Sequence, residues 1–356
     1  MKGVSALTKK VVMEGNIAVC EAALRAGCKF YAGYPITPQS SITEYLSHEM
    51  QKHGGDFVQA ESEVAAINMI AGASAGGARA MTATSGPGFS LMAEGMSFIS
   101  ASRFPAVIVD VQRSGAGGGH ILASQSDYNY ATKTLGHGGL KAFTVGPESA
   151  QEAVDWTYRA FDIADEYRCA VIVLTDGMLG QMLEPVELPE PKKDIPARDY
   201  IASGCEGRER RLVLDFTFDN LKLESWYKAA AAMYQKWEDE LAVAEEYRLD
   251  DAEYVIAAWG SSARIAKTAI DELREEGVKV GMLRAVTLHP FPVKQFHALS
   301  DQQVKKVLTV EMSDPGQFYY DVDRVLRGRF EHRFFSRSGG VIITPDEIQA
   351  AVRSML

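Results

Sequence analysis

Two uninterrupted apolar runs constrain the fold of this chain more than any other feature. Ala106-Val107-Ile108-Val109 and Ala170-Val171-Ile172-Val173-Leu174 contain no polar residue. A strand with one face in water alternates apolar and polar residues, whereas a strand covered on both faces does not. Strands of the second kind are typical of parallel sheets, because helices cover both faces of such a sheet. The two runs therefore predict a sheet buried between two layers of helices.

Strand and helix candidates alternate along the first half of the chain. The strand candidates are Phe30–Gly33, Phe57–Val58, Arg79–Thr84, Ala106–Gln112, Ala142–Val145 and Ala170–Asp176, and the helix candidates lie near residues 15–26, 39–52, 62–75, 88–101 and 147–166. Pro147 is expected at a first helical position, where Glu148 and Glu152 would favour the positive helix end. This alternation predicts an α/β fold with a doubly wound parallel sheet.

A proline-rich segment at residues 185–196 indicates a boundary after this sheet. It holds four prolines in twelve residues, a density that no regular element tolerates. A charged helix is expected next, at about Glu224–Tyr247. Its apolar stripe is expected to dock on protein, and it consists of Trp226, Met233 and Trp237.

A second series of strands and helices follows. Strands are expected at Tyr254–Trp259, Val280–Leu283 and Val307–Glu311, with helices near residues 262–276, 291–299 and 317–327, and with a last helix opened by the capping box Thr344-Pro345-Asp346-Glu347. We therefore expect a second doubly wound parallel sheet. The predicted parts are residues 1–190, a linker with the charged helix at 191–250, and residues 251–356.

Composition excludes several classes of function. The formal net charge is −10 and no cluster of Lys and Arg follows a stripe, which argues against a nucleic-acid partner. The apolar runs are too short to cross a bilayer, so no membrane partner is expected. Few cysteines favour a cytoplasmic location, and none has the Cys-x-x-Cys spacing of a metal or iron–sulfur site, so no metal site is expected in this chain. The cysteines are Cys20, Cys28, Cys169 and Cys205.

Polar side chains follow three of the predicted strands. Tyr34-Pro35-Ile36-Thr37-Pro38 follows the first, Gln59-Ala60-Glu61-Ser62-Glu63 opens a helix after the second, and Val111-Gln112-Arg113 ends a third. The prolines hold Thr37 in extended geometry at the strand end, where open α/β sheets bind ligands. A rigid strand-to-helix connection without a ligand is the alternative interpretation.

These segments resemble the alpha subunit of thiamine diphosphate-dependent 2-oxoacid:ferredoxin oxidoreductases. The resemblance also includes the turn at Thr82–Gly88 and the segments Thr175–Met182 and Ser338–Ile342. It covers nearly the whole chain apart from about residues 195–250, and it is greatest for the branched-chain (2-oxoisovalerate) group. It implies a pyrimidine-type thiamine diphosphate domain followed by a domain similar to the transketolase C-terminal domain.

The resemblance implies a catalytic role for Glu63. Its carboxylate would share a proton with N1′ of the cofactor's aminopyrimidine and so favour the imino tautomer that deprotonates C2. The alternative is an acid that only stabilises a helix N-terminus. The other cofactor-binding residues implied by the resemblance are Tyr34, Pro35, Ile36 and Ser85.

Thr37 and Arg113 match the residues that hold the substrate carboxylate in this family. A guanidinium can grip a carboxylate in a fixed, bidentate fork. The alternative for Arg113 is a structural ion pair. Gln39 stands where many relatives have a small residue, and we expect it to alter the pocket.

The resemblance also implies cofactors and partners. A beta subunit would complete the thiamine diphosphate site and hold the diphosphate with Mg²⁺. Gamma/delta-type or ferredoxin-like subunits would carry 4Fe–4S clusters, with coenzyme A as co-substrate and ferredoxin as electron acceptor. The implied reaction is oxidative decarboxylation of a 2-oxoacid to acyl-CoA and CO2. A pyruvate- or 2-oxoglutarate-specific member, a non-redox thiamine diphosphate enzyme and a non-catalytic scaffold subunit are the alternatives.

Three further motifs allow weaker predictions. The glycine-rich stretch before His120 is interpreted as a loop over the pocket, and His120 and His137 are not expected to be catalytic. Trp259-Gly260-Ser261-Ser262 could accept an anion at a helix start. Asp176-Gly177 resembles half of a metal-binding motif without the second half.

Overall fold

A seven-stranded sheet forms the centre of the N-terminal part. In the computed structural model its order is β12 (Thr287–His289), β6 (Phe143–Val145), β7 (Ala170–Asp176), β5 (Ala106–Gln112), β4 (Ala80–Thr84), β2 (Phe30–Gly33) and β3 (Asp56–Gln59). Only the edge strand β12 runs antiparallel to its neighbour. The structure describes residues 10–195 and 198–356, so residues 1–9 of the predicted first part and Pro196 of the proline-rich segment lie outside the described residues.

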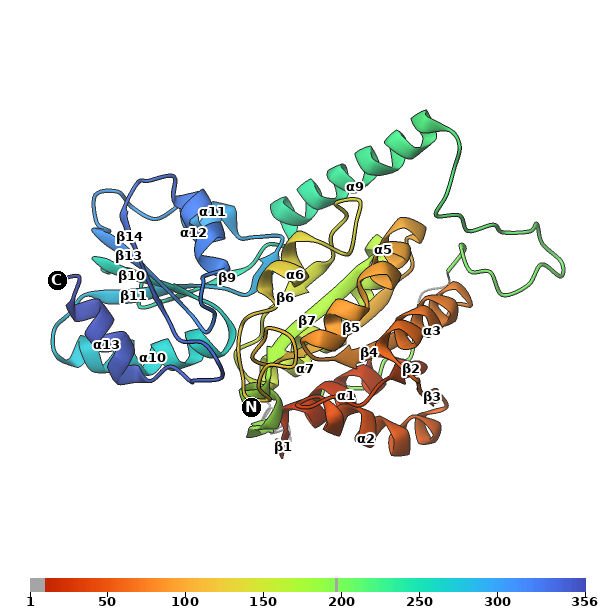
Figure 1. Ribbon diagram of the computed structural model, residues 1–356, viewed down its shortest axis with the longest axis horizontal. Helices are drawn as coiled ribbons and strands as arrows, with labels where there is room; N and C mark the ends of the chain where they lie inside the picture. Colours follow the sequence, from red (N-terminus) through yellow and green to blue (C-terminus); the bar gives the residue numbers. More distant parts are fainter. Residues whose placement is uncertain (1–9, 196–197) are drawn as a thin grey trace, which may run out of the picture.

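Helices cover both faces of this sheet (Figure 1). One apolar core contains side chains of α1 (Gly15–Arg25), α2 (Ser40–Glu49) and α7 (Ala150–Tyr167). The other contains side chains of α3 (Glu63–Ala75), α4 (Pro87–Leu91) and α5 (Ala93–Ser102). All seven residues of β5 and of β7 are buried, because both faces of each strand are covered. The doubly wound sheet predicted for this part is confirmed.

The start of α7 differs from the prediction. The helix begins at Ala150, not at Pro147, and Ser149 is its N-cap, with Oγ accepting a hydrogen bond from the Glu152 amide at 3.2 Å. A serine hydroxyl satisfies a free amide of the first turn, which a proline three residues before the helix cannot do. The predicted helix at 88–101 is likewise two helices, α4 and α5.

The second sheet is mixed. Its order is β14 (Glu331–Ser336), β13 (Lys306–Glu311), β10 (Tyr254–Ala258), β11 (Val280–Ala285) and β9 (Ala244–Tyr247). The edge strand β9 is antiparallel to β11, so the expectation of a purely parallel second sheet is wrong at that edge. One face packs on α10 (Gly260–Glu275) and α13 (Pro345–Arg353), and the other on α11 (Val293–His297) and α12 (Phe318–Leu326). The capping box predicted at Thr344 and Glu347 is present.

The charged helix is shorter than predicted. Helix α9 (Asn220–Glu240) ends before the segment that forms β9, because that segment pairs with β11. Trp237 of α9 is fully buried, with ring centroids 5.5 Å from Phe143, 5.8 Å from Tyr167 and 5.2 Å from Tyr234. The apolar stripe therefore docks on protein at Trp237, as predicted.

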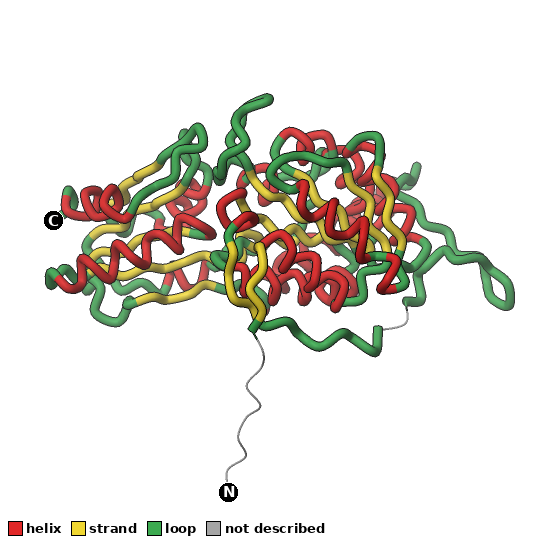
Figure 2. Tube along the Cα trace, turned by 90° about the horizontal axis from the view of Figure 1, so that it is seen from below, coloured by secondary structure: helices red, strands yellow, loops and turns green. Residues whose placement is uncertain are grey.

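Short elements that the sequence pattern did not indicate complete the fold. The antiparallel pair β1 (Val11–Glu14) and β8 (Leu183–Val186) forms a separate ribbon at the lower edge of Figure 1, midway along the long axis in Figure 2. Helix α6 (Tyr128–Lys133) follows the loop after β5, and helix α8 (Gly177–Gln181) follows β7 directly. Among the described residues, no helix combines the length and the apolar character needed to cross a membrane.

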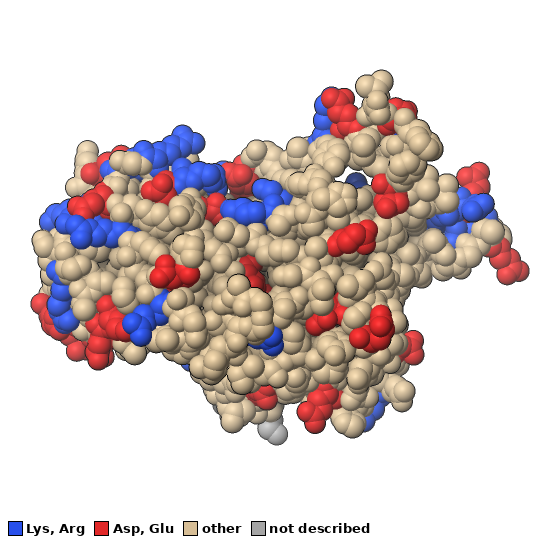
Figure 3. Space-filling view, viewed as in Figure 1, with Lys and Arg blue, Asp and Glu red and all other residues tan. Residues whose placement is uncertain are grey.

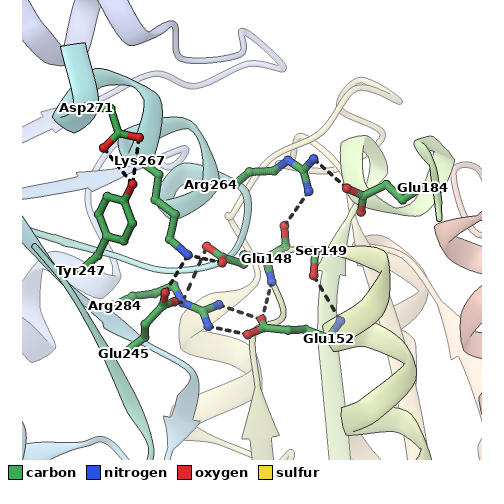
Figure 4. Close-up of polar contacts among 10 residues, drawn as sticks. All are labelled: Glu148, Ser149, Glu152, Glu184, Glu245, Tyr247, Arg264, Lys267, Asp271 and Arg284. Atoms are coloured by element: carbon green, nitrogen blue, oxygen red, sulfur yellow. Dashed lines mark hydrogen bonds and ion pairs between the residues drawn. The ribbon is translucent and has the colours of Figure 1, made fainter. Parts of the chain in front are cut away.

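A buried arginine joins the two halves of the molecule (Figure 4). Arg284 of β11 donates to both carboxylate oxygens of Glu152 on α7, at 2.8 and 2.6 Å, and to Glu245 of β9 at 2.6 Å. Only 2% of its side chain is exposed. Although burial disfavours the charged form of Glu152, the Arg284 guanidinium lowers the pKa of that carboxyl below its ordinary value. Lys267 pairs with Glu148 and Glu245 in the same cluster.

Replacing Arg284 with Ala should destabilise the protein strongly. The change leaves three carboxylates together with one lysine, and removing one partner of a buried pair costs about 3–5 kcal/mol. Urea unfolding with a shared m-value measures the loss. Lys294→Ala is the matched control, because its pair with Asp239 is exposed, so its loss should change the stability much less. Equal losses in the two variants would show that Arg284 does not hold the halves together.

Candidate functional site

The carboxyl ends of four neighbouring strands meet at one edge of the first sheet. Strands β3, β2, β4 and β5 are adjacent and parallel, so the segments that follow them emerge side by side. Thr37 follows β2, Glu63 follows β3 and opens α3, and Arg113 follows β5. The fold therefore places the three predicted site residues at the same edge, as expected.

Arg113 and Thr37 are in direct contact. Arg113 Nη1 donates to the Thr37 carbonyl oxygen at 3.0 Å, and Nη2 donates to the Gly118 carbonyl oxygen at 3.2 Å. The Nε atom is buried and has no acceptor among the described residues. Arg113 also makes no ion pair within the described part of the chain. The guanidinium thus donates to backbone carbonyls and forms no ion pair with a carboxylate of the described residues.

Glu63 is buried, with 4% of its surface exposed, at the first position of α3. The helix is capped by Ser62, whose Oγ accepts from the Ala65 amide at 3.2 Å. The Glu63 carboxylate instead lies against β4 and α4. A Cβ atom on Gly88 would come within 2.3 Å of both Glu63 Oε1 and Thr84 Oγ1, so this close approach requires glycine. Helix capping therefore does not explain the presence of a buried glutamate at position 63, because Ser62 is the N-cap of α3.

Unpartnered polar atoms surround this carboxylate. Thr84 Oγ1 and Ser85 Oγ are buried and have no hydrogen-bond partner among the described residues. Buried hydroxyls normally have partners, so two without one in sequence indicate a place where a ligand supplies them. An aminopyrimidine ring offers both donors and acceptors, and a glutamate with two hydroxyls fits such a group.

The segment after β2 borders the same region. Tyr34 and Pro35 are exposed and Ile36 is half-buried, so a cofactor can reach them. A cavity of about 360 Å³ adjoins Thr37 and is lined by Glu14, Thr37, Pro38, Ser40, Ser41 and Gln181. Gln39 does not line it. Its amide is buried and donates to Tyr31, Thr43 and the Ala83 carbonyl, so the expected effect of Gln39 on the pocket is not seen.

Two of the weaker sequence motifs contact each other. Ser261 donates a hydrogen bond to Asp176 Oδ2, and Asp176 Oδ1 caps α8 through the Met178 and Leu179 amides at 2.9 and 3.2 Å. The anion that the Trp259–Ser262 turn accepts is therefore this chain's own carboxylate. Ser262 donates to Gln125 at 2.6 Å, which ties the loop before α6 to the C-terminal half.

The remaining candidates lie as follows. His120 is exposed, and its amide donates to the Ser114 carbonyl at 2.9 Å, which closes the glycine-rich loop next to Arg113. His137 lines a separate cavity beneath α9. In the described ranges 10–195 and 198–356, no three His, Cys, Asp or Glu side chains are grouped to hold a metal ion.

Sequence reasoning missed Asp110 and Asp127, which lie next to Arg113. Asp110 is fully buried in β5, opposite Thr84 of β4. Asp127 precedes α6, and a Cβ atom on Gly86 would lie 3.9 Å from its Oδ2 and 3.6 Å from Arg113 Cγ. An aspartate inside the otherwise apolar stretch Ala106–Val111 is the signal that could have pointed to them.

Family models match both halves of the chain. Residues 21–255 match the thiamine diphosphate-binding model of pyruvate flavodoxin/ferredoxin oxidoreductases, and residues 252–348 match core domain II of pyruvate:ferredoxin oxidoreductases. The ketoisovalerate oxidoreductase subunit VorB of Methanothermobacter thermautotrophicus is 42% identical over 97% of each chain. The 2-oxoglutarate synthase subunit KorA of Methanocaldococcus jannaschii is 37% identical over 96% of this chain and 98% of its own.

Solved structures agree with these matches. The 2-oxoglutarate:ferredoxin oxidoreductase of Magnetococcus marinus, determined with 2-oxoglutarate, coenzyme A and succinyl-CoA bound, superposes with a TM-score of 0.87 at 26% identity. The match covers 98% of this chain and 66% of that longer one. A split-gene transketolase shares the fold, with a TM-score of 0.58 at 14% identity over 96% of this chain and 97% of its own. With both halves matched and the relatives aligned over nearly their full length, the chain belongs to the thiamine diphosphate-dependent 2-oxoacid:ferredoxin oxidoreductase family, as one of its subunits.

Proposed function

We propose that this chain is the alpha-type subunit of a complex that decarboxylates a branched-chain 2-oxoacid oxidatively to acyl-CoA and CO2. The observation that carries the proposal is the arrangement around one short turn, Gly86-Pro87-Gly88. The carboxylate of Glu63 lies against one end of this turn and the guanidinium of Arg113 against the other. A proton-exchanging acid and a carboxylate-binding group thus flank one space at the strand ends.

Glu63, Thr84 and Ser85 would hold the aminopyrimidine side of thiamine diphosphate. When bound, the cofactor supplies an electron sink for the carbanion that decarboxylation leaves. The chain's part is to hold a proton at the Glu63 carboxylate and to exclude water around it, since the residue is buried. Tyr34, Pro35 and Ile36 would contact the ring from the adjoining segment.

Arg113 and Thr37 would bind the substrate carboxylate. The Arg113 guanidinium is already oriented by the Thr37 and Gly118 carbonyls and carries no protein ion pair in the described residues. Because the guanidinium is not paired with a protein carboxylate, it can bind the substrate carboxylate without first breaking an ion pair. Thr37 is exposed, so its hydroxyl is available to the same substrate.

Partner subunits would complete the site. Exposed apolar side chains lie on the elements that border it, at Tyr34, Val64, Leu91, Ile121 and Leu122. Such side chains indicate a surface that another chain covers. A beta subunit there would supply the diphosphate and Mg²⁺ contacts. Gamma/delta-type or ferredoxin-like subunits would carry 4Fe–4S clusters that pass electrons to ferredoxin.

The proposal includes no nucleic-acid partner, and it places the protein in the cytoplasm. On the face seen in Figure 3, Lys and Arg are interspersed with Asp and Glu and form no continuous basic stripe. Cys20, Cys28 and Cys169 are buried free thiols. Free thiols fit a reducing cytoplasm.

The cavity next to Thr37 supports a substrate with a neutral side chain. Glu14 lines it and accepts a hydrogen bond from Ser41 at 2.6 Å, and the cavity has no Lys or Arg in its lining. An acidic wall repels the second carboxylate of 2-oxoglutarate. The 42% identity to a ketoisovalerate oxidoreductase subunit favours the same substrate class. A 2-oxoglutarate-specific complex is the second candidate, favoured by the synthase subunit at 37% identity.

Purification of the chain alone and with its beta partner tests the whole proposal. Alone, the chain should not retain thiamine diphosphate in equilibrium dialysis, because half of the site is missing. The complex should retain it and should use 2-oxoisovalerate with at least a tenfold higher kcat/KM than 2-oxoglutarate, roughly the effect of 1.4 kcal/mol. Micromolar cofactor binding by the single chain would refute the shared site, and a preference for 2-oxoglutarate would select the second candidate.

Glu63→Gln should slow turnover while the complex still binds cofactor. Glutamine has nearly the same volume and can hydrogen-bond to the ring, but it cannot exchange a proton with it. Hydrogen–deuterium exchange at C2 of bound thiamine diphosphate should fall by about 100-fold or more, in parallel with turnover. Glu61→Gln is the matched control, since Glu61 is exposed two residues away. If Glu63→Gln exchanges C2 at the wild-type rate, Glu63 is not the proton-exchanging acid.

Arg113→Lys should weaken substrate use and spare the cofactor. Lysine keeps the charge but loses the planar fork, so KM for the 2-oxoacid should rise by about tenfold or more with thiamine diphosphate affinity unchanged. Arg353→Lys, in an exposed pair with Glu276, serves as the control and should leave both values unchanged. An equal loss of cofactor and substrate binding would mean that Arg113 organises the turn and does not read the carboxylate.

A further inference from the structure

A buried carboxyl group lies directly behind the proposed substrate site. Asp110 is fully buried in β5, between apolar residues, and its register partner on β4 is Thr84. Neither of its carboxylate oxygens has a hydrogen-bond donor among the described residues. An ionised carboxylate in such a place, without donors, would carry a large desolvation cost. The group therefore needs a proton or a partner that shares one.

Asp127 is that partner. It reaches the same place from the loop before α6, and its Oδ2 is also buried without a donor among the described residues. The Asp127 amide donates to Gln112 Oε1 at 3.0 Å, and Gln112 lies on the same face of β5 as Asp110, so the two carboxyl groups lie close together. Burial raises the pKa of Asp127 to about 6, and burial together with the Asp127 carboxyl raises the pKa of Asp110 well above its ordinary value. Two carboxyl groups this close do not both ionise, and one proton shared between them gives one oxygen of each group a hydrogen-bond partner.

Three groups face the pair. The Arg113 guanidinium favours the ionised form of Asp127, and the backbone of Gly86 favours the ionised form of both aspartates. The Tyr130 hydroxyl is buried without a partner, and both aspartates raise its pKa, to about 12 with burial as the largest cause. Among the described residues, Arg113 is thus the cation whose charge acts on Asp127.

We propose that Asp110 and Asp127 share one proton and form a positioning unit for Arg113 and the Ser85–Gly86 turn. The inference rests on the proposed function, in which Arg113 binds the substrate carboxylate. A singly charged pair attracts the guanidinium without a close ion pair, since Arg113 has none within 4 Å among the described residues. It therefore helps to orient Arg113 and leaves the N–H groups that the Thr37 and Gly118 carbonyls do not use free for the substrate. A doubly charged pair would attract the guanidinium more strongly and pull it away from the substrate site. A neutral pair would exert no net attraction on it.

Asparagine substitutions allow the singly charged pair to be compared with a neutral one. In Asp110→Asn or Asp127→Asn, the amide donates to the remaining carboxylate and so mimics the pair with one proton and one charge. Each single variant of the complex should keep KM for the 2-oxoacid within about threefold of wild type. The double variant is isosteric but neutral, and its KM should rise by about tenfold or more with thiamine diphosphate affinity unchanged. A merely structural pair would tolerate the double variant, because its volume and hydrogen bonding are preserved.

Infrared difference spectroscopy tests the shared proton without using activity. At pH 7 the wild-type complex should show a protonated carboxylic acid band, sensitive to D2O, that both single variants lose. Asp56→Asn is the control, since Asp56 is an exposed aspartate of the same sheet, and it should keep the band. Unchanged spectra in both single variants would overturn the shared proton, whatever the substrate proves to be.

Thermal unfolding adds a second readout. Because the folded pair has a raised pKa, its contribution to stability is complete below the unfolded value of about 4 and is lost as the pH rises through about 6. The Tm of wild type relative to Asp127→Asn should therefore increase on going from pH 8 to pH 5. A Tm difference that does not change with pH would contradict the shared proton.

If the infrared band is lost in the single variants but KM is unchanged in the double variant, the proton is shared, and either the positioning role of the pair or the role of Arg113 in substrate binding is wrong. Arg113→Lys then decides between these two.

Discussion

The parallel pairing of β4 with β5 is the constraint on which the site depends. Thr84 lies opposite Asp110 in this pairing, so the turn that follows β4 is held beside the segment that leads to Arg113. Because all neighbouring strands run in the same direction, Thr37 and the start of α3 emerge at the same edge. A shift of one residue would turn Thr84 and Asp110 to opposite faces of the sheet and separate the groups that flank the turn.

Buried polar groups have hydrogen-bond partners between the two halves of the molecule, whereas several at the candidate site have none. Around Arg284, the carboxylates of Glu152 and Glu245 are hydrogen-bonded to the guanidinium, as Figure 4 shows, and the cluster joins α7 to β9 and β11. At the strand ends, the hydroxyls of Thr84 and Ser85 and the Nε atom of Arg113 have no partner in the described part of the chain. Satisfied clusters hold a structure together, whereas unsatisfied groups mark where a ligand is expected.

Much of the N-terminal sheet could be predicted from periodicity. The strands Ala106–Gln112 and Ala170–Asp176 have the predicted bounds, because a strand buried on both faces leaves a continuous apolar run. The short strands β1, β8, β9, β12 and β14 were missed. Apart from those of β12, their residues are mostly exposed or half-exposed, and the strands form only because a partner strand is present. The same competition ends α9 before Ala244, where pairing with β11 replaces the helix.

The sequence by itself determined the order of the long strands and helices and the identity of Thr37, Glu63 and Arg113 as candidates, since these depend on local patterns and on motifs. Tertiary structure alone decided that Ser62 caps α3 while Glu63 turns toward Gly88, and that Asp110 meets Asp127 across seventeen residues of chain. It also decided that Ser261 and Asp176 bind each other. The reason is physical: which polar groups find partners depends on which strands are adjacent, and adjacency is a property of the folded sheet.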